Sequence, residues 1–374
     1  MSIALILRNA SRWSWALAVL AVACKSETSP AAETAGTSAD DDDPSGDDDD
    51  DDDPTVADSG DATSDPSDPS DPSDPSNPSD PSNPSSNGSV DDDGGDGEDP
   101  DPPVANEPNL PSITGTCPDF FQTLDFQLTH DLTFAPDTLT PRVVRLFMDE
   151  SVVDQDGPIV FYWHGTGGNP NEAIQGLGQD GIAAIRAAGG IVVAPFADEA
   201  SGMFPWTPVG GNIDHDNLLA DEIIACAVDQ VGIDPHRIHS VGFSAGGIHT
   251  VTMSVRRAAY LASVVSYSGG EFGPTLAPDT DPDNLFAAMS VHGGPDDVYE
   301  GVVSFQEPSE HYADLLQMSG RFALLCDHGQ GHSVPVSIQA SVVQFFADHP
   351  WGTTPSPYLG GLPSAFPDGF CVIP

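Results

Sequence analysis

Short apolar runs alternate with longer amphipathic segments from residue 113 to the end of the chain. The short runs are rich in β-branched residues and almost continuously apolar, which is typical of strands that are buried on both faces of a parallel sheet. We therefore predict strands at 143–148, 158–163, 191–195, 237–243, 261–266, 285–292 and 322–326. A further strand at 123–130 is expected to be antiparallel and to lie at the sheet edge.

The segments between these runs have helical periodicity. In 216–231, for example, Leu219, Ile223 and Cys226 fall on one face, while Asp221 and Glu222 fall on another. The same reasoning predicts helices at 171–188, 216–231, 245–259, 309–318 and 337–348. Alternating strands and helices predict an α/β fold, with a mostly parallel, right-handed, doubly wound sheet of about eight strands and helices on both faces.

A serine stands at the junction between a predicted strand and a predicted helix. Residues 242–247 read Gly-Phe-Ser-Ala-Gly-Gly, and the run 237–243 precedes them. This arrangement is typical of a nucleophile elbow, in which the glycines are needed because the sharp turn brings strand and helix too close for side chains. Ser244 is therefore the candidate nucleophile, and the alternative is an ordinary glycine-rich helix start.

A serine hydroxyl near neutral pH needs a base within hydrogen-bond reach. The loop after the last long strand offers His332, which follows Gly331 in a turn-forming segment. His328 is the competing candidate, and either histidine could have a purely structural role in the loop.

A carboxylate should orient the base and stabilise its positive form, and in elbow-containing folds it lies between serine and histidine in the chain. The predicted strand 285–292 leads directly into Asp296 and Asp297. We choose Asp296 as the acid and keep Asp297 as its rival.

Acyl transfer also needs backbone donors aimed at the developing oxyanion. Ala245 supplies one amide, because it lies at the helix N-terminus just after the nucleophile. The glycine-rich loop after the predicted strand 158–163 supplies the other, and Thr166 is the expected donor there.

The N-terminus resembles a bacterial secretion signal. Arg8 and Arg12 are followed by an apolar stretch that ends at Cys24 and is shorter than a typical membrane-spanning helix. Small residues before a single cysteine are typical of a lipoprotein signal, although Ala21 stands where leucine is usual. We predict a signal at 1–24 with Cys24 lipidated, so that a lipid anchor is the chain's contact with membrane, and simple cleavage is the alternative.

Residues 25–112 have almost nothing to bury. Positions 26–112 carry 28 acidic residues and no Lys or Arg, and an Asp/Asn-Pro-Ser triplet repeats seven times between Asp65 and Ser85. Charge repulsion and regular proline predict a disordered, extended linker. Calcium capture by the aspartate runs is a weaker interpretation, because no glycine-spaced ligand loop organises them.

The folded part, predicted to span 113–374, has 31 acidic residues against seven arginines, which makes nucleic acid an improbable partner. Four cysteines remain besides Cys24, and an even number in an exported chain indicates two disulfides. Their spacing matches no zinc pattern, and we expect no metal and no other cofactor. Three pairings remain open among Cys117, Cys226, Cys326 and Cys371.

Most of residues 125–350 resemble the extracellular α/β-hydrolase esterases grouped with polyhydroxybutyrate depolymerases and with feruloyl and acetylxylan esterases. The shared residues are the 164–168 loop, Asp234-Pro235 through Arg237, the 242–247 elbow, His292-Gly293 with Asp296, and 329–332. The resemblance implies the roles given above and a catalytic domain at 113–374. The segments 202–208 and 271–283 match no one subfamily, and Trp206 is a candidate for a substrate pocket, with packing as the alternative.

The favoured function is a secreted serine esterase acting on polyester or on feruloyl or acetyl esters of polysaccharides. A peptidase of the same fold is a second hypothesis, and the lack of a large accessory domain weighs against it. A third is a catalytically silent surface lipoprotein used for binding, against which the full set of serine, acid, base and oxyanion loop argues. The sequence leaves the oligomeric state open.

Overall fold

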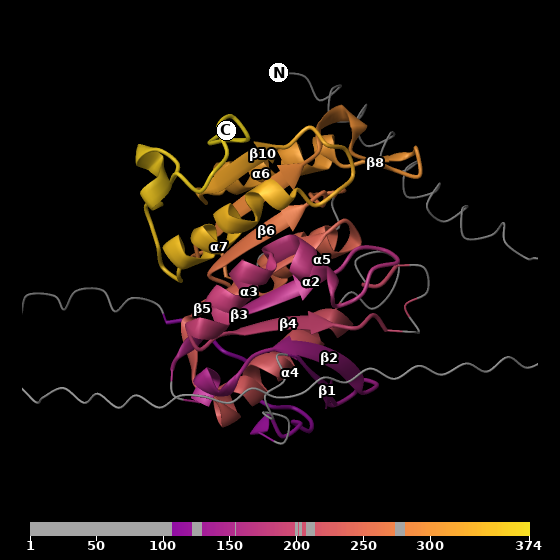
Figure 1. The fold of residues 1–374 in the computed structure, drawn as a ribbon, viewed down its shortest axis with the longest axis vertical. Coiled ribbons are helices and arrows are strands. Elements are labelled where there is room, and N and C mark those ends of the chain that lie inside the picture. Colours follow the sequence, from indigo (N-terminus) through magenta and orange to yellow (C-terminus); the bar gives the residue numbers. More distant parts are fainter. Residues whose placement is uncertain are drawn as a thin grey trace, which may run out of the picture. The chain divides into compact units, whose positions relative to one another are not determined.

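A computed structural model describes residues 107–121, 129–153, 155–198, 201, 204–206, 214–273 and 281–374. The centre of this described part is a nine-stranded sheet (Figure 1). Its strand order is β1-β2-β4-β3-β5-β6-β7-β10-β11, and the run from β4 to β10 is parallel. The other three strands pair antiparallel to their neighbours. The strands are β1 (His130–Phe134), β2 (Arg142–Phe147), β3 (Gly157–Trp163), β4 (Ile191–Pro195), β5 (Ile233–Phe243), β6 (Ser263–Tyr267), β7 (Ala287–His292), β10 (Ala323–Asp327) and β11 (Cys371–Val372). The predicted mostly parallel α/β fold is confirmed.

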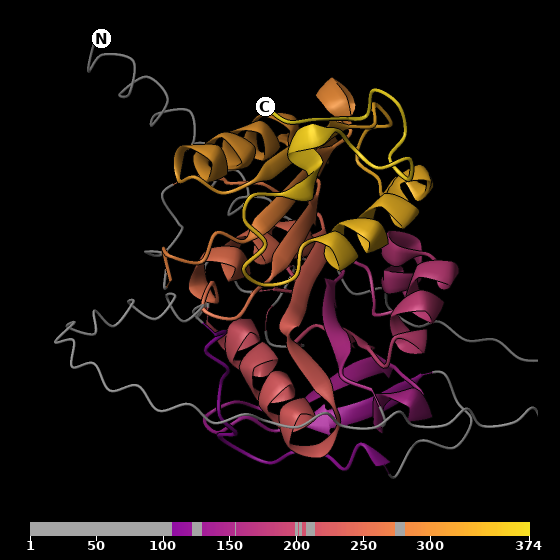
Figure 2. The same ribbon diagram turned by 90° about the vertical axis from the view of Figure 1, so that its left-hand side faces the viewer.

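Helices cover both faces of this sheet. The helices are α2 (Glu172–Leu177), α3 (Gln179–Ala187), α4 (His215–Gln230), α5 (Ala245–Arg256), α6 (Gln306–Met318) and α7 (Gln339–Asp348). Figure 2 shows α4 and α6 on one side of the sheet, and α2, α3 and α7 on the other. A small hairpin of β8 (Val298–Tyr299) and β9 (Val303–Ser304) stands apart from the main sheet.

Alternate residues of the buried strands supply two separate apolar cores. In β3, Phe161 and Trp163 pack on the side of α4, α5 and α6, whereas Val160 and Tyr162 pack on the side of α2, α3 and α7. Because successive strand residues point to opposite faces, a strand between two helix layers must be apolar throughout. This requirement explains the continuous apolar runs in the sequence.

Two expectations about the elements need correction, and a third lies mostly outside the described residues. The antiparallel edge strand β1 begins at His130, and most of the segment 123–130 lies outside the described residues. The single helix predicted at 171–188 is two helices, because Gly178 between them has a φ of +76°. A ninth strand, β11, is only two residues long, and such a short segment carries no detectable periodicity.

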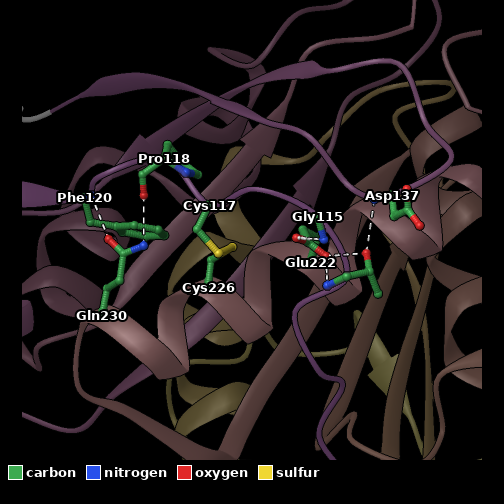
Figure 3. Close-up of a disulfide and its surroundings, with 9 residues drawn as sticks. Gly115, Cys117, Pro118, Phe120, Asp137, Glu222, Cys226 and Gln230 are labelled. Carbon is green, nitrogen blue, oxygen red and sulfur yellow. Dashed lines mark hydrogen bonds between the residues drawn. A yellow bond between two sulfur atoms is a disulfide. The ribbon is translucent and has the colours of Figure 1, made fainter.

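The structure selects one of the three cysteine pairings. Cys117 is bonded to Cys226 and Cys326 to Cys371. Figure 3 shows how the first disulfide fastens the segment before β1 to α4, where the Glu222 carboxylate accepts hydrogen bonds from Thr114 and Gly115. The second disulfide fastens β11 to β10.

The predicted signal at 1–24, Cys24 and the linker at 25–112 lie outside the described residues. Among the residues that are described, none of the helices has the length and apolar character needed to cross a bilayer. Disulfides are typical of proteins that mature in an oxidising compartment, which is consistent with an extracellular location.

Candidate active site

Ser244 occupies a strained turn between β5 and α5. Its φ of 56° and ψ of −117° are unusual for a residue with a side chain, and such strain is typical of a nucleophile elbow. A Cβ atom on Gly246 would collide with the carbonyl oxygen of Trp163, and one on Gly242 would collide with the backbone of Gly246. The strand and the helix can therefore approach this closely only with glycine at both positions.

The structure brings Ser244 and His332 together although 88 residues separate them in the chain. The distance between Nε2 of His332 and Oγ of Ser244 is 2.9 Å, and Nδ1 of the same ring lies 2.7 Å from Oδ1 of Asp297. The choice of Asp296 as the acid is therefore wrong, and its rival Asp297 holds the position. Asp296 lies in a short 3-10 turn with its side chain exposed, one residue too early to reach the ring.

Asp297 is completely buried and receives three polar contacts. Besides the His332 contact, its Oδ2 accepts hydrogen bonds from Oγ of Ser268 at 2.8 Å and from the backbone N–H of Gly293 at 2.9 Å. Hydrogen bonds to a carboxylate offset the cost of burying its charge. The contacts also fix the carboxylate so that one oxygen faces the imidazole.

His328, the competing base, does not contact Ser244. Its Nδ1 accepts a hydrogen bond from the backbone N–H of Gln330, and burial lowers the pKa of the ring. The structure therefore favours the structural alternative for His328.

Aromatic rings surround the imidazole of His332. The Phe305 ring stacks on it at a centroid distance of 4.6 Å, and the rings of Phe243 and Tyr299 lie at 4.8 and 5.9 Å. The His332 side chain retains 15% exposure. A small exposed fraction lets a substrate reach the ring while most of its surface is shielded from water.

The loop after β3 forms a tight turn. The N–H of Gly168 donates to the carbonyl of Gly165 at 2.9 Å, and Gly167 has a φ of +76°, as expected for the third residue of a type II turn. Thr166 is the second residue of this turn. Ala245, the other expected oxyanion donor, is the first residue of α5, so its N–H has no acceptor within the helix.

Trp206 does not line a substrate pocket. Its side chain is 1% exposed, its Nε1–H donates to the carbonyl of His164 at 2.7 Å, and its ring packs edge-on against Trp163 at 4.9 Å. The packing alternative is therefore correct, since a side chain buried on all sides cannot contact substrate.

One group of possible metal ligands occurs among the described residues, formed by Cys117, Glu222 and Cys226. The two sulfur atoms are bonded to each other, and the Glu222 carboxylate accepts three hydrogen bonds. These atoms are therefore already engaged in holding the segment before β1.

Sequence reasoning did not identify two groups of residues at this site. Ser268 follows β6 directly, and a polar residue after a buried strand was an available signal for it. Phe305 and Tyr299 gave no such signal, because an aromatic residue in a loop is compatible with many roles.

No protein-family model matches the chain, and neither does any curated protein sequence. Among solved structures, native pOPH matches with a TM-score of 0.52 and 15% identity over 71% of this chain and 97% of that one. Native sOPH matches with a TM-score of 0.52 and 16% identity over 69% and 96%. A ferulic acid esterase matches with a TM-score of 0.47 and 13% identity over 59% and 97%. The chain has the α/β-hydrolase fold, and the structures similar to it include esterases.

Proposed function

We propose that the chain is a serine hydrolase that cleaves carboxylic esters through an acyl-enzyme. One observation carries the proposal, namely the continuous path from Oγ of Ser244 through both ring nitrogens of His332 to Asp297, with distances of 2.9 and 2.7 Å. A nucleophile, a base and a buried acid in this order are the parts that serine acyl transfer requires.

In the first half of the reaction, Oγ of Ser244 attacks the ester carbonyl carbon while Nε2 of His332 takes the hydroxyl proton. Asp297 stabilises the imidazolium that results and keeps the Nδ1 proton in place. The carbonyl oxygen becomes an oxyanion, for which the amides of Ala245 and Thr166 are the proposed donors. Nε2 then returns the proton to the departing alcohol.

In the second half, water attacks the acyl-serine with His332 again acting as base, and the acid product leaves with Ser244 regenerated. The protein supplies the nucleophile, the proton carrier and the charge stabilisation, so the proposed route needs no cofactor.

The proposed substrates are neutral esters outside the cell, either polyester or the feruloyl and acetyl esters of polysaccharides. The resemblance at the 164–168 loop, the elbow and the 329–332 segment supports these classes. Release of soluble acid from a polyester film, a feruloylated arabinose ester and acetylated xylan, measured with one enzyme preparation, would rank them.

A lipid on Cys24 is the proposed means of holding the protein at the cell envelope. The support is the apolar segment that ends in Ala21 to Cys24, together with two disulfides in the described residues. Mass spectrometry of the mature N-terminus should detect a diacylated or triacylated cysteine. An unmodified N-terminus beyond Cys24 would contradict the anchor.

Hydrolysis of a short p-nitrophenyl ester by the purified protein tests the enzymatic proposal. Turnover should be lost in Ser244→Ala and kept in Ser337→Ala, a control that alters an exposed serine in the 3-10 helix Val336–Ile338. Equal activity in both variants would refute the role of Ser244. Turnover of peptide anilides without ester hydrolysis would favour the peptidase hypothesis, and no turnover at all would favour the binding protein.

A further inference from the structure

The carbonyl oxygen of Gly165 is held by two donors. The N–H of Gly168 donates to it at 2.9 Å, and Nδ1 of His164 lies 2.8 Å away. A carbonyl oxygen can only accept a hydrogen bond, so the proton of the His164 ring must be on Nδ1. The side chain of His164 therefore fixes the direction of this carbonyl.

The carbonyl of Gly165 and the N–H of Thr166 belong to the same peptide plane. In a trans peptide these two groups point in opposite directions. Whatever holds the Gly165 carbonyl therefore also directs the Thr166 N–H to the opposite side of the plane. In the proposed function, this N–H is an oxyanion donor, and it can stabilise the oxyanion only if it points toward it.

The neighbouring peptide plane is held by Glu172, the first residue of α2. Its Oε1 accepts the N–H of Gly165 at 2.9 Å, and its carboxylate lies so close to Gly168 that a Cβ there would be 2.5 Å from Oε2. Each of the two peptide planes that meet at Gly165 is thus held by a side chain, one by the imidazole of His164 and one by the carboxylate of Glu172.

We propose that His164 and Glu172 are positioning residues that hold the Gly165–Thr166 peptide with its N–H toward the developing oxyanion. The inference rests on the proposed function, because it assigns a purpose to the orientation of one proposed oxyanion donor. Neither side chain touches the reacting atoms, and both act through the backbone of the turn.

The surroundings of His164 keep the required ring form. The side chain is 3% exposed, and burial lowers its pKa, so the ring is neutral at physiological pH. The indole N–H of Trp206 donates to the His164 carbonyl, and the two rings lie 4.8 Å apart. The buried Trp206 thus fixes the backbone and the ring of His164 together.

Substitutions at Glu172 separate positioning from general packing. Glu172→Ala removes the acceptor for Gly165, whereas Glu172→Gln keeps a side-chain oxygen that can accept the same hydrogen bond. Asp180→Ala is a matched control, because Asp180 is an exposed acid in the first turn of the next helix, α3.

Substitutions at His164 use the same logic. His164→Asn and His164→Leu both remove the ring and its packing, but the amide nitrogen of Asn can replace Nδ1 as a donor to the Gly165 carbonyl. Thermal unfolding of each variant identifies any that fail to fold, and the comparison is made between folded variants.

The readouts are kcat and KM for a short p-nitrophenyl ester, and the inhibition constant of an alkyl boronic acid that forms a tetrahedral adduct on Ser244. Removal of an oxyanion donor lowers kcat by about 10²- to 10³-fold, so its misalignment should lower kcat by about 10- to 100-fold with KM little changed. We expect this loss in Glu172→Ala and His164→Leu, with a parallel weakening of boronic acid binding. Glu172→Gln, His164→Asn and Asp180→Ala should stay within a few-fold of the unaltered protein.

Unchanged kcat and boronic acid affinity in a folded Glu172→Ala protein would overturn the proposal, and so would equal losses in the Asn and Leu variants at 164. The unaltered protein and Ser244→Ala are measured alongside. Loss of activity in Ser244→Ala with no effect at 164 and 172 refutes the positioning roles alone, whereas activity that survives in Ser244→Ala refutes the proposed function.

Discussion

Replacing Asp297 by asparagine should nearly abolish activity while leaving the fold intact. The amide has the size of the carboxylate, and its oxygen can still accept hydrogen bonds from Ser268 and Gly293. Its NH₂ group would then face Nδ1 of His332, 2.7 Å away in the present structure. Because an NH₂ group can only donate, the ring would have to place its proton on Nε2, where it would no longer accept the Ser244 proton.

The size of this loss follows from the known cost of a wrong tautomer. A wrong imidazole tautomer in a serine triad lowers kcat by about 10⁴-fold, which corresponds to about 5.5 kcal/mol of transition-state stabilisation. The full burial of Asp297 favours an effect of this size, since no water can replace the missing charge from that side. We expect a fall of about 10³- to 10⁴-fold in kcat, with KM changed far less.

The assay is p-nitrophenyl ester hydrolysis by the purified protein, with Asp296→Asn as the matched control. The control removes the same charge one residue earlier, where the side chain is exposed. It should retain activity within a few-fold. A large loss in Asp296→Asn together with a mild effect in Asp297→Asn would refute the assignment, whatever the distances in the structure.

Three further predictions concern stability. Burial lowers the pKa of His249 to about 4, whereas the same ring in the unfolded chain has a pKa of about 6.5. As the pH falls from about 6.5 toward about 4, only the unfolded chain takes up this proton, so the free energy of unfolding should fall by about 3 kcal/mol. His249→Leu should flatten this pH dependence in urea titrations. Burial raises the pKa of Glu271 to about 7, so stability should fall as the pH rises from about 4.5 to about 7, and equal slopes in Glu271→Gln and the unaltered protein would contradict this. Joint replacement of Cys117 and Cys226 by serine should lower the free energy of unfolding by about 5 kcal/mol in the same titrations, because this disulfide closes a loop of 109 residues. Joint replacement of Cys326 and Cys371 should lower it by about 4 kcal/mol, because that loop has 45 residues.

The strands and the elbow were predictable because strong local requirements determine them. A strand between two helix layers has to be apolar at every position, as in β3 and β4, and the sequence carries that requirement directly. The glycines around Ser244 are likewise required by contacts with the backbone of Trp163, which no larger residue would permit. Both signals can be recognised in the sequence without knowledge of the remaining structure.

The choice between Asp296 and Asp297 depended on a turn that leaves no periodic signal. Gly294 has a φ of 77°, and the backbone N–H of Asp297 donates to the carbonyl of Gly294, which closes a turn that leaves Asp296 exposed and Asp297 buried. The burial of Trp206 and the pairing of the cysteines also depend on contacts between distant segments. Such contacts could not be derived from composition or spacing.

Backbone hydrogen bonds link the loops that carry the three candidate catalytic groups. The N–H of Ser244 donates to the carbonyl of Tyr267 at 2.9 Å, and the N–H of Ser268 donates to that of Val291 at 2.7 Å. These bonds continue the parallel pairing of β5 with β6 and of β6 with β7 past the strand ends, and both donors have a positive φ.

The N–H of Gly331 extends the same series by donating to the carbonyl of Gly293 at 3.0 Å, which carries the loop of His332 to the loop of Asp297. The strained backbone at Ser244 and at Ser268 is thus stabilised in each case by a hydrogen bond from its own N–H to the next strand. Because none of these three bonds involves a side chain, substitutions at 244 and 332 should change the chemistry of the site while the backbone that supports it stays in place.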